Sequence, residues 1–312
     1  MRKHRTFVLG ASVLAVALLA GACSSGGGDN NNAGSGTTPA PAQKGTLVVG
    51  VSGNFAENQL VAEMYAQVLE NAGYTVKREL DIKSRDVGNA ALASGKLDLK
   101  PEYTGFDLVT YDKNATTNGD PATVAAALKA AVAKDGLTTY GFSPANSTNV
   151  FVTTPETAQQ NHLTDMSSLA SVASQLTLGA PADCTSAAFC IPGLKKTYGV
   201  DFGDFKPLEP GAATVAAIDS GAVDVGELFS LDPTISDKGY HVLTDDKNLQ
   251  ADGNFIPVVR NEVASPQLGQ LLDSVTSKLT DDNMREMVGQ VQNQHQDVSD
   301  VAKTFLQNQG IL

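Results

Sequence analysis

Two aromatic–hydroxyl pairs stand at matching places in the sequence. Tyr103-Thr104 follows residues 97–99, and Phe229-Ser230 follows residues 223–225 at the same offset. Apolar and polar residues alternate in both preceding segments, which predicts short strands. Aromatic faces attract cations, hydroxyls form hydrogen bonds, and ligands of open α/β sheets bind beyond the carboxyl ends of strands. The pairs therefore predict two similar lobes that face one ligand cleft.

The segments before these pairs repeat as well. Each strand is preceded by an apolar helical segment that ends at a glycine, Gly95 or Gly221. We expect Pro101 to end the first strand, because proline cannot donate to a sheet ladder. The Thr104 hydroxyl is then placed to cap a helix. Units of helix, glycine and strand are common in any α/β protein; the matched aromatic–hydroxyl pairs favour two related lobes.

The N-terminus has the pattern of a secretory signal over residues 1–22. Three basic residues precede an apolar run at 7–19 that is too short for a comfortable membrane span. Small residues before Cys23 look like a bacterial lipobox, which predicts cleavage before Cys23 and a lipid on its sulfur. An ordinary cleaved signal is the alternative. We expect an extracytoplasmic protein anchored to the cell membrane by this lipid.

Residues 23–44 are predicted to form a flexible tether. Gly, Ser, Asn, Thr, Pro and Ala dominate this segment, so it cannot bury enough apolar surface to fold. The whole chain has 312 residues, a formal net charge of −12 and a pI of about 4.7. This acidic balance argues against nucleic-acid binding and against a basic membrane-surface patch.

The remaining cysteines, Cys184 and Cys190, are separated by five residues. Export permits oxidation, and no histidine stands nearby, so a disulfide is favoured over a metal pair. The four histidines form no ligand spacing elsewhere in the sequence. We therefore expect no metal site and no cofactor.

The rest of the chain alternates strands and helices, as an α/β protein does. Ser84 is a plausible helix N-cap, and Arg85 beside it either points into the cleft or is a solvated surface charge. The first lobe is expected over residues 45–147 and 242–312, and the second over 148–241. Strands are expected at 46–51, 74–80, 138–142, 149–152, 176–179, 239–243 and 256–260, and helices at 57–71, 121–134, 167–173 (capped by Ser167), 193–198, 265–279, 281–292 and 299–309. The last three helices should cover the first lobe.

From about Thr46 onward the chain resembles substrate-binding proteins of ABC importers for glycine betaine, choline and related osmoprotectants. The most specific matching piece is Pro-Glu-Tyr-Thr-Gly at 101–105. The other matching pieces lie at 52–57, 92–99, 144–148, 192–199, 229–232 and 257–260. The resemblance implies a type II periplasmic-binding fold, in which two lobes close on a ligand like a hinge.

The resemblance also implies a ligand site with a cage of aromatic side chains around a quaternary ammonium. Tyr103 matches the first tyrosine of that cage; Asn149 and Phe229 replace two others, and the fourth falls near Gly253. A lysine that often meets the ligand carboxylate falls at Gly53, which weakens the usual carboxylate clamp. Asn54, Arg85, Asn149 and Asp232 should make the pocket more polar than is usual. The residues expected to bind the ligand are Ser52, Asn54, Arg85, Tyr103, Thr104, Asn149, Phe229, Ser230, Asp232 and Asn254.

The leading hypothesis is a monomeric binding protein that delivers a small polar solute to an ABC permease. The sequence has no Gly-x-Ser-x-Gly elbow, His-Glu-x-x-His motif or phosphate loop, so we expect no catalysis. A secreted hydrolase is the weaker alternative, with carboxylates such as Glu102, Asp107 and Asp232 as acid and base. A ligand sensor for a membrane receptor would use the same binding chemistry.

Overall fold

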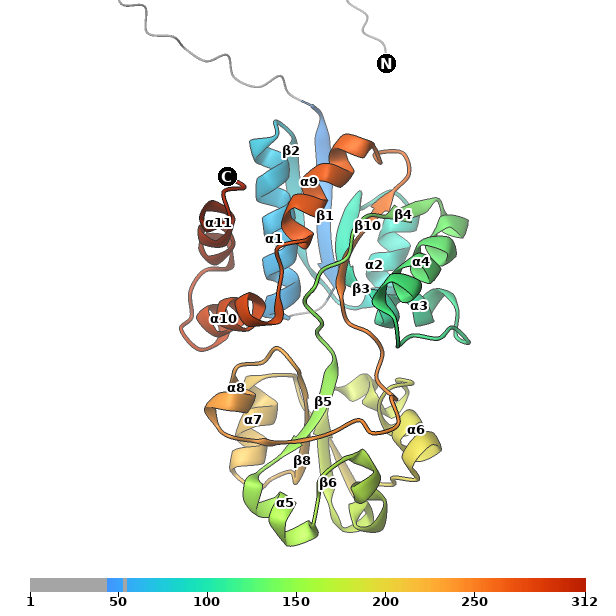
Figure 1. The fold of residues 1–312 in the computed structure, drawn as a ribbon, viewed down its shortest axis with the longest axis vertical. Coiled ribbons are helices and arrows are strands. Elements are labelled where there is room, and N and C mark those ends of the chain that lie inside the picture. Colours follow the sequence, from blue (N-terminus) through green and yellow to red (C-terminus); the bar gives the residue numbers. More distant parts are fainter. Residues whose placement is uncertain (1–43, 53–54) are drawn as a thin grey trace, which may run out of the picture. The chain divides into compact units, whose positions relative to one another are not determined.

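The computed structural model describes residues 44–52 and 55–312, in which two five-stranded sheets each form the centre of a lobe (Figure 1). The first sheet has the order β2-β1-β3-β10-β4. Its strands are β1 (Thr46–Ser52), β2 (Thr75–Ile82), β3 (Leu99–Tyr103), β4 (Leu137–Thr139) and β10 (Phe255–Arg260). Strand β1 pairs in parallel with β2 and β3, whereas β10 is antiparallel to β3 and β4.

The second sheet repeats this arrangement with the order β7-β6-β8-β5-β9. Its strands are β5 (Asn149–Thr153), β6 (Thr177–Ala180), β7 (Asp204–Pro207), β8 (Val225–Phe229) and β9 (His241–Leu243). Strand β6 is parallel to β7 and β8, and β5 is antiparallel to β8 and β9. The equivalent positions of the parallel and antiparallel strands confirm two related lobes.

An equivalent aspartate hydrogen bond in each lobe shows that the sequence repeat corresponds to a repeat in the structure. The Asp98 carboxylate, just before β3, accepts a hydrogen bond of 2.8 Å from the Val48 N–H in β1. The Asp224 carboxylate, just before β8, accepts one of 2.8 Å from the Thr177 N–H in β6. Each aspartate therefore fixes a strand beside its parallel neighbour in the same way.

Helices at the C-terminus cover the first lobe, as the sequence predicts. Leu60 and Met64 of α1 pack in one buried cluster with Leu272 of α9, Met284 of α10 and Leu306 of α11, and all five are fully buried. The helices of this lobe are α1 (Ala56–Asn71), α2 (Arg85–Ala93), α3 (Thr104–Tyr111), α4 (Pro121–Val132), η1 (Ala133–Asp135), α9 (Pro266–Thr276), α10 (Asp281–Gln292) and α11 (Val298–Asn308).

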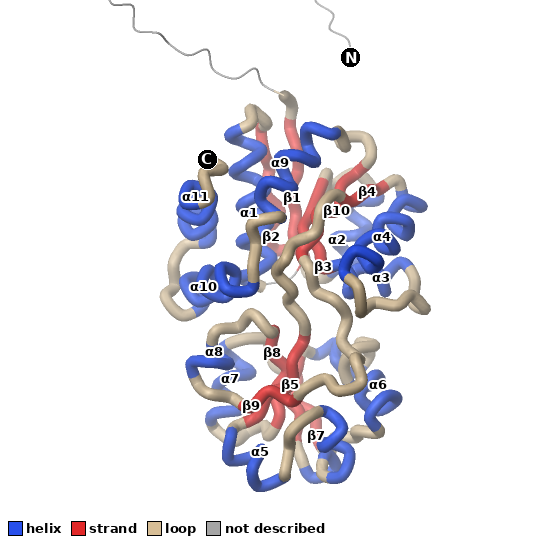
Figure 2. The backbone as a smooth tube through the Cα atoms, in the orientation of Figure 1, coloured by secondary structure: helices blue, strands red, loops and turns tan. Residues whose placement is uncertain are grey.

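Shorter helices surround the second sheet (Figure 2). They are α5 (Pro155–Asn161), η2 (Met166–Ser171), η3 (Ala173–Gln175), η4 (Ala182–Thr185), α6 (Ile191–Gly193), η5 (Leu194–Tyr198), α7 (Ala212–Asp219) and α8 (Thr234–Asp237). The cap of η2 is Asp165 and not Ser167, because the Asp165 carboxylate accepts the Ser168 N–H in a capping box.

Two expectations around Pro101 are wrong. Strand β3 continues through Pro101 to Tyr103, with Pro101 opposite Pro257 of β10. The backbone bonds between these strands fall on alternate pairs, as Arg260 N–H to Asp98 O shows, so Pro101 and Pro257 face each other where no N–H is needed. Thr104 is the first residue of α3 and not its cap, and no side chain caps that helix.

The chain crosses between the sheets twice, before β5 and before β10, and Asn146 forms a backbone bridge with Asn254 where the two segments meet. The return to the first lobe comes later than residue 242. Strand β9 extends to Leu243 in the second sheet, and Thr244 pairs with Asp165 of the second lobe. The sequence places this boundary too early because β9 is followed by a loop that stays on the second lobe.

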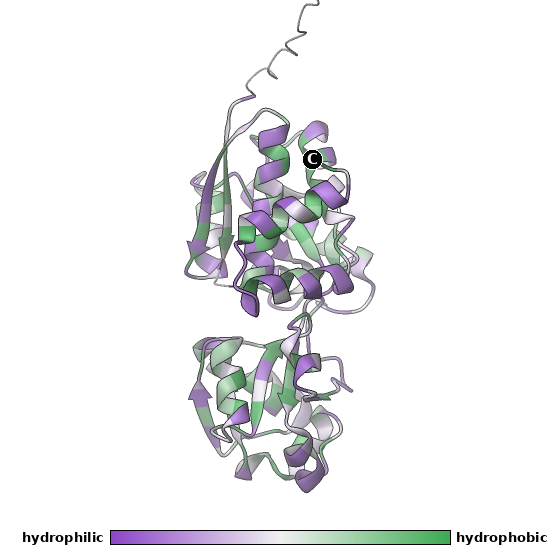
Figure 3. Cartoon of the chain, turned by 90° about the vertical axis from the view of Figure 1, so that its left-hand side faces the viewer, coloured by the Kyte–Doolittle hydropathy of each residue, from purple (hydrophilic) through white to green (hydrophobic). Residues whose placement is uncertain are grey.

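Figure 3 shows green hydrophobic and purple hydrophilic residues on opposite faces of many helices, and purple also on strands at the edge of each lobe. None of the helices within 44–52 and 55–312 has both the length and the apolar character needed to cross a membrane.

Candidate ligand-binding site

A cavity of about 830 Å³ is lined by residues of both lobes. Five aromatic side chains face it: Phe55, Tyr103 and Phe106 from the first lobe and Phe189 and Phe229 from the second. Tyr103 and Phe229 were expected from the sequence. Phe55, Phe106 and Phe189 were not, because neither copy of the repeat has an aromatic residue at a matching position for them.

Two of these aromatic contacts join the lobes. The rings of Phe55 and Phe229 lie 4.9 Å apart at 76°, and those of Phe106 and Phe189 lie 5.2 Å apart at 80°. Edge-to-face pairs of this kind leave the second face of a ring free for another group. The cavity can therefore surround a small cation or an apolar group with aromatic surface.

Glu57 is a buried acid at the junction of the lobes. The Tyr103 hydroxyl donates to its carboxylate at 2.5 Å, and the Ser147 hydroxyl, in the first crossing segment, donates at 2.9 Å. Burial raises the pKa of Glu57 to about 7, against the lowering effect of these two hydrogen bonds. Glu57 belongs to a matching piece of the sequence resemblance, but only its burial beside Tyr103 identifies it as part of the site.

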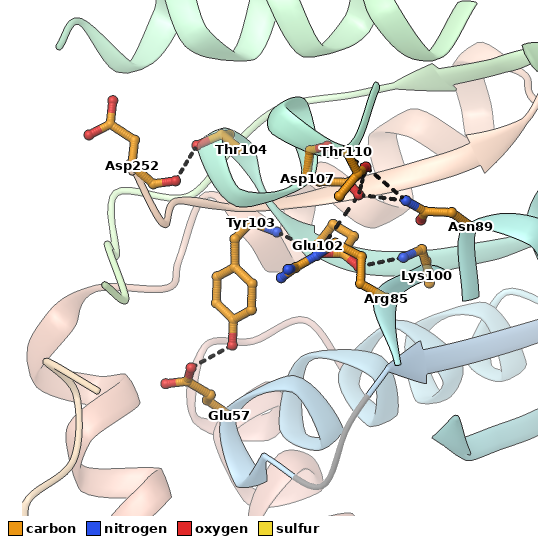
Figure 4. A network of polar contacts seen from close by, with 10 residues as sticks. All are labelled: Glu57, Arg85, Asn89, Lys100, Glu102, Tyr103, Thr104, Asp107, Thr110 and Asp252. Carbon is orange, nitrogen blue, oxygen red and sulfur yellow. Dashed lines mark hydrogen bonds and ion pairs between the residues drawn. The ribbon is translucent and has the colours of Figure 1, made fainter. Parts of the chain in front are cut away.

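Arg85 points into the cavity and is held by a buried ionic network (Figure 4). Its Nε donates to Glu102 Oε2 at 2.9 Å, and Glu102 also accepts from the fully buried Lys100. Although burial opposes ionisation of Glu102, the cations of Arg85 and Lys100 lower its pKa to about 2. These contacts favour the interpretation that Arg85 faces the cleft over the alternative that it is a solvated surface charge.

The carboxyl of Asp107 completes this network on the side of α3. Asn89 donates to its Oδ1 at 2.9 Å, and Arg85 Nε lies 4.0 Å from the same oxygen. Burial and the nearby Glu102 carboxylate raise the pKa of Asp107 to about 6. Burial alone would lower the pKa of Arg85, but Glu102 and Asp107 raise it above its ordinary value, so the guanidinium is always charged.

The second lobe contributes Asn149, Glu227 and a disulfide to the cavity wall. The structure joins Cys184 to Cys190, with a Cα–Cα distance of 5.1 Å. Glu227 was not singled out from the sequence, since it is one residue of a strand with no motif around it. Glu227 and the two cysteine sulfurs lie close together, but a disulfide leaves no thiolate to bind a metal.

Four of the expected ligand residues do not line this cavity and instead hold the polypeptide chain near the crossings. Thr104 and Ser230 bond to backbone carbonyls, and Asn254 donates to Ser143 O at 2.9 Å. The Asp232 carboxylate accepts from the Thr234 N–H at 2.8 Å. Ser52 ends β1, but its side chain and the whole of Asn54 lie outside the described residues.

Two further aromatic residues lie outside the cavity. Phe255 is fully buried behind Tyr103, with ring centres 5.1 Å apart. Tyr240 belongs to the core of the second lobe, where its hydroxyl donates to Asp219. Of the ten expected ligand residues, the structure thus brings Arg85, Tyr103, Asn149 and Phe229 together.

The sequence is similar to those of known solute-binding proteins. The glycine betaine-binding protein YehZ of Escherichia coli (strain K12) is 25% identical over 267 residues, which cover 81% of this chain and 88% of that protein. The ergothioneine transport permease/ergothioneine binding protein EgtU of Helicobacter pylori (strain G27) is 26% identical over 261 residues, covering 82% of this chain and 46% of that protein.

Solved structures show the same fold. The crystal structure of a glycine betaine/carnitine/choline ABC transporter protein matches with a TM-score of 0.69 and 24% identity, covering 86% of this chain and 99% of that one. This similarity confirms the two-lobe fold of type II periplasmic binding proteins. Residues 45–308 match the family model described as the substrate binding domain of the ABC-type glycine betaine transport system. The chain belongs to this family of substrate-binding domains, which bind a small solute for an ABC importer.

Proposed function

We propose that the protein captures a small osmoprotectant-like or quaternary-amine-like solute in the cavity between its lobes and delivers it to its permease. The supporting observation is the ring of five aromatic side chains, contributed by both lobes, with buried acids behind it. Aromatic faces stabilise a cation that cannot form hydrogen bonds, by about 0.5–2 kcal/mol for each well-placed ring.

The residues that we propose to contact the solute are Tyr103 and Phe229, through their ring faces, and Arg85 and Asn149, through polar groups. Relatives named for betaine and for ergothioneine support a solute that has both a carboxylate and a methylated nitrogen. Glu57 orients the Tyr103 ring through its hydroxyl and so acts as a positioning residue.

Isothermal titration calorimetry of the purified protein tests this proposal. We expect saturable binding by at least one member of a panel containing glycine betaine, choline, carnitine and ergothioneine. Free ligand at about 100 times its dissociation constant should also stabilise the fold by roughly 2.7 kcal/mol in a thermal-shift assay. Absence of binding across this panel and across small amino, guanidino and imidazole carboxylic acids, with a folded protein, would contradict the proposal.

We also propose that the protein is a monomer held outside the cell membrane by a lipid on Cys23, which lies outside the described residues. The support is the small-residue run before Cys23 and the polar segment that follows it. Mass spectrometry of the protein from membranes should find residues 1–22 removed and a diacylglyceryl group on the cysteine. A Cys23→Ser variant should leave the membrane fraction.

A further inference from the structure

Glu227 is a buried carboxyl on the cavity wall without a hydrogen-bond donor among the described residues. Its side chain belongs to β8, the residue is only 6% exposed, and its Oε2 lies 3.1 Å from Cys190 Sγ. That sulfur belongs to the disulfide and carries no proton. Burying a carboxylate without a donor is costly, so Glu227 keeps its proton in the empty cavity and is stabilised as a carboxylate only when a cationic donor binds beside it.

The neighbouring loop donates no hydrogen bond to Glu227 within the part of the chain that the structure describes. The disulfide joins Cys184 to Cys190, the Ala187 N–H donates to Asp183 O at 2.8 Å, and the Cys190 N–H donates to Ala187 O at 3.1 Å. A group bound in the cavity can therefore supply the donor that Glu227 lacks.

The first lobe contributes hydrogen-bond donors that lack an acceptor. Arg85 uses Nε to bind Glu102, while its Nη1 and Nη2 groups have no hydrogen-bond partner among the described residues. The side chain is 30% exposed and lines the same cavity as Glu227. A guanidinium whose two NH2 groups are free is suited to a carboxylate or another planar oxyanion.

We propose that the cavity binds an amphoteric solute whose oxyanion contacts Arg85 and whose cationic nitrogen keeps at least one N–H, which it donates to Glu227. This inference rests on the proposed function and narrows its substrate class. A fully methylated nitrogen satisfies the aromatic faces but leaves Glu227 without a donor. The predicted solutes are small carboxylic acids with an amino, guanidino or imidazole group.

Matched pairs of probes test the inference by calorimetry. We would compare glycine, 3-aminopropionate, 4-aminobutyrate and 4-guanidinobutyrate with the N-trimethyl derivatives of the three amino acids, and include choline as a cation without a carboxylate. A charged hydrogen bond contributes enough that the N–H member should bind about tenfold or more tightly than its trimethyl partner. Glu227→Gln should remove that advantage without weakening the trimethyl partner.

The second arm concerns Arg85. Arg85→Gln should weaken every carboxylate probe about tenfold or more while changing choline by less than about threefold, because choline has no anionic group to pair with the guanidinium. Glu156→Gln and Lys77→Gln, two exposed residues that do not line the cavity, are charge-matched controls and should change no affinity by more than about threefold.

The outcomes separate the two proposals. Tighter binding of the trimethyl member, or an equal effect of Glu227→Gln on both members of a pair, would overturn this inference and leave the proposed function standing. If no probe and no member of the earlier panel binds, both proposals are wrong.

Discussion

Thr104 and Ser230 make the same pair of hydrogen bonds to opposite crossing segments. The Thr104 N–H donates to Asn254 O at 3.0 Å, and its hydroxyl donates to Asp252 O at 3.3 Å. The Ser230 N–H donates to Thr148 O at 2.9 Å, and its hydroxyl donates to Asn146 O at 3.2 Å. In each lobe, the residue after the aromatic therefore holds the segment about which the lobes would turn.

Removing one of these hydroxyls should affect stability more than solute binding. Thr104→Val keeps the side-chain shape and should lower the free energy of unfolding by about 1 kcal/mol, measured by urea denaturation. Solute affinity should change by less than about threefold, because the side chain does not line the cavity. Ser220→Ala, at the exposed residue that follows α7, is the control. Lost binding with unchanged stability would instead place Thr104 against the solute.

Glu227 should make the stability of the empty protein depend on pH. Burial, with a contribution from Asp183, raises its pKa from 4.5 to about 8. The folded state therefore keeps a proton that the unfolded state has lost, and stability falls as pH rises from about 4.5 to about 8. Above that range Glu227→Gln should be more stable than the parent by roughly 5 kcal/mol, at about 1.4 kcal/mol per pKa unit.

The two proteins should be equally stable near pH 4, where Glu227 is protonated in both states. Thermal unfolding across this pH range measures the difference, with Glu209→Gln as the exposed control. A pH-independent effect of Glu227→Gln would mean that Glu227 ionises normally inside the cavity.

The Phe229 ring should contribute through its π face and not only through its apolar surface. Phe229→Leu keeps a large apolar side chain and should weaken a quaternary-amine ligand about fivefold or more, whereas Phe229→Tyr should retain most of the affinity. Calorimetry with choline measures both variants. Equal binding by the leucine and tyrosine variants would indicate that the contact is only hydrophobic.

Glu102 should be needed for folding as well as for the position of Arg85. Glu102→Gln leaves Lys100, which is fully buried, with an uncompensated charge, and should cost about 3–5 kcal/mol of stability. Chemical denaturation measures the free energy of unfolding of Glu102→Gln, with Glu79→Gln, an exposed site in β2, as the control. The Lys100→Met variant should cost less, because Glu102 still pairs with Arg85.

The disulfide should matter to the cavity because its loop carries Phe189. Cys184→Ser/Cys190→Ser should lose about 2 kcal/mol of stability and bind solute more weakly, since Phe189 is then free to leave Phe106. Affinity with and without a reductant measures the effect, and the double serine variant in reductant is its control. Unchanged affinity after confirmed reduction would mean that other contacts fix the loop.

Local sequence patterns predict most of the strands and helices, but only part of the site. The repeat is visible because Asp98 and Asp224 stand at the same offset before similar residues, and both fix a strand in the structure. The end of β3 is predicted wrongly at Pro101. A strand tolerates proline where the missing N–H is not needed for a hydrogen bond to the next strand. That depends here on β10, which lies far along the chain.

The cavity residues that the sequence did not reveal share one property: their role comes from distant neighbours. Phe189 matters because Phe106 lies opposite it, and Glu227 because Cys190 and the cavity surround it. Glu227 has no motif around it, and the predicted disulfide loop gives no sign of which residue Phe189 contacts. The sequence singles out Thr104 and Ser230 because each follows a strand and an aromatic residue. In the structure, their hydroxyls bind the crossing segments and do not line the cavity.

The strand order of the first sheet has a consequence for how the chain folds as it is made. Strand β10 lies between β3 and β4, so β4 has no place in the sheet until residues 255–260 are available. The second sheet uses only strands from β5 to β9, which are contiguous in the chain. In N-to-C synthesis or translocation, the second lobe can be completed first. The first lobe begins earlier and is finished last, when β10 enters its sheet and the C-terminal helices cover α1.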